Sequence, residues 1–123
     1  MLPVEARMRR PADFTLAVRR GSRSGRRTLT GHLLVRAERA DHDEPALVGF
    51  VVSRAVGNAV TRNKVRRRLR HIARDYMDSL PGGSLLVVRA NPPAAAARQS
   101  DLAAEFDLVL GTLLRRQVGA LHQ

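Results

Sequence analysis

The segment from Ala46 to Arg74 constrains the fold more than any other part of the chain, because it joins two different patterns. It opens with a near-continuous apolar run of strand length, ALVGFVVS. After a Gly57-Asn58 turn, apolar residues recur at intervals of three and four, which is the spacing of one helix face. That face consists of Val65, Leu69, Ile72, Ala73, Tyr76 and Leu80. The segment therefore predicts a buried strand followed by a helix that packs on a core.

The opposite face of this predicted helix is strongly basic. Eight Lys or Arg residues lie between Arg54 and Arg74, and no Asp or Glu occurs from Ala46 to Arg74. A solvated helix face usually interleaves acids with bases, whereas an acid-free run accumulates repulsion without relief. The basic face therefore favours a polyanionic partner over plain solvation. A membrane-surface helix is disfavoured, because the apolar face has the character of one that packs on a core.

Composition supports a nucleic-acid partner. The 123 residues suit a single domain, 1–123, and include 22 Lys and Arg against 11 Asp and Glu, for a formal charge of +11. Nearly all of the basic residues are arginine, whose planar guanidinium suits phosphate. The absence of cysteine excludes disulfides and thiolate metal sites. No apolar run approaches a membrane span, and the N-terminus lacks the apolar core of a signal peptide, so we expect a cytoplasmic protein without a membrane partner.

The N-terminal half predicts a helix and two strands. Residues 1–10 are basic and lack apolar periodicity, which indicates an extended arm. Pro11 suits the first turn of a helix that Gly21 ends, and a flexible loop, GSRSGRRT, follows. A strand is expected over residues 29–37 and another over 46–53. The acidic loop ERADHDEP between them suggests an antiparallel hairpin.

The C-terminal half predicts one strand, SLLVVRA, and one amphipathic helix that begins near Ser100. Residues 117–123 are expected to form a frayed tail. The element order is therefore helix, strand (or strands), strand, helix, strand, helix. This order predicts an α+β fold, a two-layer sandwich in which helices pack on one mixed sheet of about four strands.

The sequence offers little for an autonomous enzyme. The histidines His32, His42, His71 and His122 have no metal-ligand spacing. The only carboxylate cluster, Asp41, Asp43 and Glu44, is better interpreted as a solvated loop, and neither GxGxxG nor a Walker motif is present. We therefore expect no catalytic residue, no metal site on the protein and no small-molecule cofactor. A free-standing nuclease is disfavoured on the same grounds.

The run GNAVTRNKVRRRLR, Gly57 to Arg70, closely resembles the central motif of the protein component of bacterial ribonuclease P. The resemblance extends to ADF at residues 12–14, to Gly21 and to LLVVRANPPA. It implies that a catalytic RNA with bound Mg²⁺ removes the 5′ leader of precursor tRNA, and that the protein binds both RNAs. It also implies a left-handed crossover between parallel strands, against the usual rule. A structural RNA binder of ribosomal type is the alternative, since it shares the charge and the small α+β fold.

Site residues follow from the same resemblance. Those implied to face the catalytic RNA are Arg54, Asn58, Arg62, Asn63, Lys64, Arg66, Arg67 and Arg70. Those implied for the cleft that receives the leader are Phe14, His32, Ser53 and Arg89. Stacking on an aromatic ring tolerates any base, although a plain core contact explains Phe14 equally well. Three departures are notable: Lys64 replaces an arginine, and His32 and Val18 stand where the family often has aromatic residues.

Overall fold

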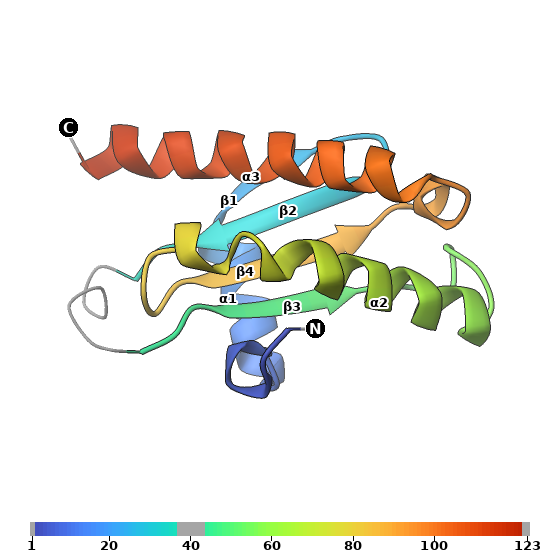
Figure 1. Cartoon of the computed structure of the whole chain (residues 1–123). Helices are drawn as coiled ribbons and strands as arrows, with labels where there is room; N and C mark the ends of the chain where they lie inside the picture. The colour runs from blue at the N-terminus through green and yellow to red at the C-terminus, as the bar shows by residue number, and fades with distance from the viewer. Residues whose placement is uncertain (1, 37–43, 122–123) are drawn as a thin grey trace.

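The computed structural model describes residues 2–36 and 44–121, with the backbone alone for residues 118–121. Within these ranges three α-helices and four strands follow one another in the order α1, β1, β2, β3, α2, β4, α3 (Figure 1). The helices are α1 (Pro11–Arg20), α2 (Ala59–Arg74) and α3 (Gln99–Leu121). The strands are β1 (Ser22–Gly25), β2 (Leu29–Leu34), β3 (Leu47–Val51) and β4 (Leu85–Ala90). The predicted α+β class and the mixed sheet of four strands are confirmed.

The sheet has the strand order β1-β2-β4-β3, in which only β3 and β4 are parallel. The predicted hairpin between the strands on either side of the acidic loop is therefore wrong, because β4 lies between β2 and β3. In Figure 1, β4 lies above β3, both strands run in the same direction and α2 crosses in front of them. The crossover is thus left-handed, as the resemblance implied.

The predicted loop GSRSGRRT contains β1, which pairs antiparallel with β2 through Ser22↔Leu33 to Gly25↔Thr30. Sequence reasoning missed this strand because its side chains are small or charged and show no apolar alternation. β1 forms through main-chain pairing at the edge of the sheet, which requires little from its side chains.

The two faces of the sheet are covered differently. α2 and α3 pack on one face over the main core, in which Leu29, Leu33 and Val88 are buried beneath Leu69 and Phe106. α1 lies on the opposite face (Figure 1) and adds a partial third layer to the predicted two-layer arrangement. The smaller core beneath α1 consists of Met8, Ala17, Leu85 and Val87. This second face is covered by α1, and a cleft lies between that helix and the sheet.

The predicted buried faces of the helices are largely confirmed, but α2 ends at Arg74, so Tyr76 and Leu80 of its predicted face lie beyond the helix. The buried residues of α2 are Val65, Leu69, Ile72 and Ala73, as the spacing predicted. α1 begins at Pro11 and has Gly21 as its C-cap. α3 continues through Leu121, so the predicted frayed tail is helical to that residue, and residues 122–123 lie outside the described part of the chain.

The predicted N-terminal arm is docked on the sheet. The main-chain N–H of Met8 donates to the carbonyl of Val48 on β3 at 2.9 Å, and Arg7 forms an isolated parallel bridge with Val48. Leu2, Ala6 and Met8 are buried. The apolar residues that anchor the arm are too irregularly spaced for a periodicity search to detect. In the acidic loop, Asp41, His42 and Asp43 lie outside the described residues.

Candidate RNA interface

The basic residues of α2 form two groups. Arg62, Arg66 and Arg70 recur every four residues along one side of the buried stripe and are half-buried. Asn63, Lys64 and Arg67 are exposed. The helix thus holds its polar residues both on its outer face and along the border where it meets the sheet.

Hydrogen bonds fix the start of this helix. The side-chain oxygen of Asn58 accepts the N–H of Thr61 at 2.9 Å, which makes Asn58 the N-cap of α2. Arg66 donates from Nη1 to Oδ1 of Asn63 at 3.1 Å and from Nη2 to the carbonyl of Val52 at 3.4 Å. Asn58 therefore caps the basic helix and Asn63 holds the side chain of Arg66, while Arg54 is exposed in the turn that precedes the helix.

A cleft of about 250 Å³ lies between α1 and the sheet, and it brings together two of the predicted leader residues, Phe14 and Arg89. Thr15, Val18, Arg19 and Val51 also line it. Sequence reasoning missed Arg19 here because the short basic end of α1 looks like an ordinary helix terminus. The cleft combines an aromatic ring with two arginines, a combination found in proteins that bind single-stranded nucleic acid.

Phe14 makes a core contact and also lines the cleft. Its ring lies directly on Gly49 of β3, where a Cβ would come within 2.5 Å of the ring atoms, so only glycine allows this contact. The ring also packs beside the small core under α1, yet it is half-buried and lines the cleft. A core contact and a stacking surface are therefore compatible at this residue.

His32 and Ser53 do not line the cleft, although both are close to it in the fold. His32 sits on β2 opposite Arg23 of β1 and Val87 of β4, and is 6% exposed. Its Nδ1 has no hydrogen-bond partner within the described residues. Burial, together with the charges of Arg23 and Arg89, lowers the pKa of His32. Ser53 is exposed, two residues beyond the end of β3.

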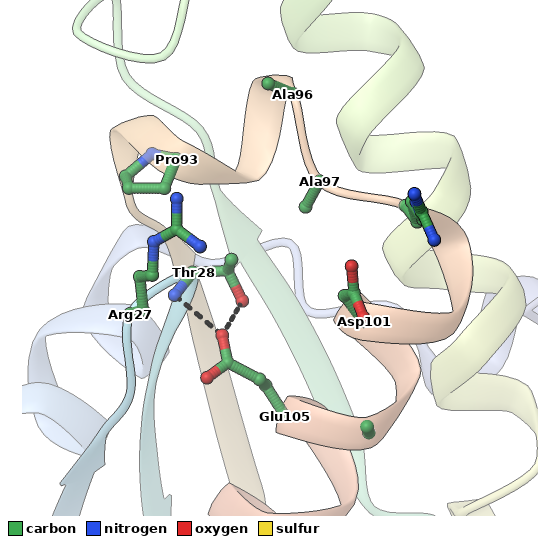
Figure 2. A pocket seen from close by; sticks show the side chains of 9 residues that line it. Arg27, Thr28, Pro93, Ala96, Ala97, Asp101 and Glu105 are labelled. Atoms are coloured by element: carbon green, nitrogen blue, oxygen red, sulfur yellow. Dashed lines mark hydrogen bonds between the residues drawn. The ribbon is translucent and has the colours of Figure 1, made fainter.

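Another hollow, where the β1–β2 turn meets the start of α3, has a different character (Figure 2). Arg27 and Arg98 line it, but so do Asp101 and Glu105. Glu105 accepts hydrogen bonds from both the N–H and the hydroxyl of Thr28, and this hydroxyl bond is the main reason its pKa is lowered. The hydrogen bonds in this hollow connect α3 to the sheet. Its lining contains both acids and arginines, so it suits a polyanion less well than an all-basic surface does.

The described part of the chain brings no three His, Asp or Glu residues close enough to hold a metal ion. No described helix is both long and apolar enough to cross a membrane. The candidate site consists of the basic side of α2 and the cleft under α1.

The family model for ribonuclease P matches residues 2–114. The chain belongs to the ribonuclease P protein family. It is 56% identical over 110 residues to the ribonuclease P protein component of Nocardioides sp., covering 89% of this chain and 92% of the relative. It is 48% identical over 126 residues to that of Thermobifida fusca, covering 100% of this chain and 86% of the relative.

Solved structures of ribonuclease P proteins share the fold. The Staphylococcus aureus protein superposes with a TM-score of 0.75 at 23% identity, covering 87% of this chain and 94% of that one. The Thermotoga maritima protein gives 0.69 at 23% identity, covering 89% and 96%. The chain is thus the protein component of ribonuclease P, a subunit of the ribonucleoprotein endoribonuclease that processes tRNA, and its partner is an RNA. Membership in this family separates it from the ribosomal-type alternative.

Proposed function

We propose that this chain binds the catalytic RNA of ribonuclease P through α2 and the 5′ leader of precursor tRNA through the cleft under α1. It thereby assists removal of the leader, while catalysis belongs to the RNA. The observation that carries the proposal is the continuous basic side of α2, which meets no acid between Ala46 and Arg74 and lies beside a cleft containing Phe14 and Arg89. The proposal includes a cytoplasmic location, since its RNA substrates belong to that compartment in bacteria.

Each part of this surface suits a different part of RNA. The guanidinium groups of Arg62, Arg66, Arg67 and Arg70 can each grip phosphate oxygens at two points, and Lys64 supplies a point charge. Phosphate contacts of this kind set affinity and position without reading sequence. In the cleft, Phe14 offers a ring face to an unstacked base, while Arg89 and Arg19 face the backbone that accompanies it.

Mg²⁺ is proposed as the cofactor of the assembled enzyme, held by the RNA. Hard cations of this kind prefer oxygen ligands and retain several waters, and RNA phosphates supply such ligands. This chain would contribute by neutralising nearby phosphates, which lets RNA segments approach each other at lower Mg²⁺.

Reconstitution with its own catalytic RNA at low Mg²⁺ tests the proposal. We expect faster cleavage of precursor tRNA than with the RNA alone, and the gain should shrink when the leader is shortened to one nucleotide. The control is precursor-tRNA cleavage by the RNA at high Mg²⁺, which establishes that the RNA is active. Equal rates with and without the protein at low Mg²⁺ would contradict the proposal.

A further inference from the structure

A notch of about 230 Å³ lies at the edge of β3, between the N-terminal segment and α2. Four arginines line it: Arg7 and Arg9 from the N-terminal segment, and Arg66 and Arg70 from α2. Phe14 and Phe50 contribute the aromatic part of its wall, and no acidic residue lines it. Neither Arg7 nor Arg9 was among the predicted site residues.

The two arginine pairs are more than 50 residues apart in the sequence, and the fold holds both in place. On the N-terminal side, the bond from Met8 to Val48 and the bridge at Arg7 fix an extended segment, with Met8 buried. In extended chain, residues two apart project to the same side, so Arg7 and Arg9 share one side of this segment. On the other side, the helical spacing of four places Arg66 above Arg70.

The arginines in the notch have few partners. Within the described residues, the side chains of Arg9 and Arg70 make neither a hydrogen bond nor an ion pair. The guanidinium of Arg7 donates only through Nε, to the carbonyl of Leu2 at 3.2 Å, and that of Arg66 donates to Asn63 and Val52. Four guanidinium groups around one small space repel each other unless an anion enters. The planar donors of arginine favour phosphate as that anion.

A neighbouring hollow differs from the notch in that acidic residues line it. Arg7 and Arg9 also border this second hollow, which Arg10, Glu5 and Asp13 line as well. Acids therefore occur on one side of the N-terminal segment, and the notch on the other side has none. Arg10 lines the hollow with the acids but not the notch, so it provides a matched control of equal charge.

Phe14 connects the notch to the proposed leader cleft, because its ring forms part of the wall of both. A single strand that stacked on this ring in the cleft would therefore run next to the notch. We propose that the notch binds a backbone phosphate of RNA, and that Arg7 and Arg9 are RNA-binding residues that act together with Arg66 and Arg70. This inference rests on the proposed function and extends its surface from α2 to the N-terminal segment.

The test measures affinity for the catalytic RNA over a series of salt concentrations, using the full chain and the variants Arg9→Gln, Arg70→Gln and the double variant. Each single variant should lower the slope of log affinity against log salt by about 1, the value for one lost phosphate contact. The double variant should lose less affinity than the product of the two single losses, because both residues hold the same group. Arg10→Gln combined with Arg70→Gln should give the plain product. Circular dichroism of each variant checks the fold, and Arg9 and Arg10 are both exposed.

A second arm separates the two possible sources of the phosphate. Holoenzyme assembled with each variant binds precursor tRNA with a leader of one nucleotide or of several. Losses in catalytic-RNA binding assign the phosphate to that RNA, whereas losses that appear only with the longer leader assign it to the leader. Either result supports the notch as a phosphate site.

Two results would overturn the inference, and they differ from failure of the proposed function. If Arg9→Gln bound RNA as tightly as the native chain in both arms, Arg9 would not be part of the interface. If the affinity losses of Arg9→Gln and Arg70→Gln simply multiplied in the double variant, the two residues would not hold the same phosphate. In both cases the native chain still stimulates cleavage. Absence of stimulation by the native chain would instead overturn the proposed function and the notch with it.

Discussion

Two hollows of this protein are lined by arginines, but only one of them also has acidic residues in its lining. At the β1–β2 turn, Arg27 and Arg98 share their hollow with Asp101 and Glu105, and the neighbouring Arg68 of α2 donates to the carbonyl of Ala97. At the β3 edge, the notch formed by Arg7, Arg9, Arg66 and Arg70 has no acid in its lining. The first hollow sets acids among its arginines, whereas the second has no acid to offset their charge.

The difference teaches that arginine content alone does not locate an RNA surface in so basic a chain. Arg68 lies within the basic run of α2, yet its guanidinium holds the loop before α3. Gln99 at the start of α3 donates in return to the carbonyl of Arg68 at 3.4 Å. One helix therefore uses its arginines for two purposes, and the contacts of each residue decide which purpose applies.

Leu69→Ala should have the largest effect, because it removes a core contact that anchors α2 to the sheet. Leu69 is 0% exposed in the main core, and truncation of a buried leucine costs about 2–5 kcal/mol of unfolding free energy. Urea denaturation measures the loss. Val60→Ala, at a residue 77% exposed on the same helix, is the control and should change stability little. An equally small loss at Leu69 would show that α2 is not anchored through this stripe.

Glu105→Gln should have the next largest effect and should act on stability alone. The carboxylate accepts two hydrogen bonds from Thr28, and bonds to a charged group contribute more than neutral ones, so we expect a loss of about 1–2 kcal/mol. Affinity for the catalytic RNA should remain at the native value, measured at a temperature where both proteins are folded. A variant of native stability that binds RNA more tightly would instead make this hollow part of the interface.

The sequence predicted the arginine face of α2 and its buried stripe because both depend on local spacing, which one helix determines by itself. The position of β4 between β2 and β3 could not be predicted in this way, since pairing joins segments distant in the chain. The same limit explains the N-terminal segment. Arg7 and Arg9 were recognisable as basic, but their approach to Arg66 and Arg70 depends on a main-chain bond from Met8 to Val48.

The predicted site residues likewise divide into those set by local sequence and those set by contacts between distant segments. Phe14 and Arg89 line one cleft because α1 packs on the face of β4 that carries Leu85, Val87 and, two residues on, Arg89. His32 was assigned to that cleft through the family resemblance, and its burial depends on the pairing of β2 with β1 and β4, which the local sequence does not show. Asn58 was expected at the RNA surface, and its side-chain oxygen caps α2.

Arg67→Gln compared with Arg68→Gln tests the two uses of arginine within one helix. The two residues are adjacent and carry the same charge, but Arg67 is exposed and Arg68 donates to Ala97. We expect Arg67→Gln to lower the salt slope of RNA binding by about 1 without affecting stability. Arg68→Gln should instead lower stability by about 1 kcal/mol, the contribution of one hydrogen bond. If the two variants changed RNA binding equally, the hydrogen bond from Arg68 to Ala97 would not keep Arg68 out of the RNA interface.

His32 should give the smallest effect, a pH dependence of stability that belongs to the cleft face of the sheet. Its pKa is lowered by burial and by Arg23 and Arg89, so below its ordinary value of about 6.5 the unfolded chain binds a proton that the folded chain does not. The free energy of unfolding should therefore fall as the pH decreases below about 6.5, and His32→Gln should remove that part of the decrease. His71→Gln, at an exposed histidine on α2, is the control that leaves His32 in place. If urea denaturation at several pH values gives the same profile for the native chain and for His32→Gln, the histidine is not held in its neutral form by its neighbours.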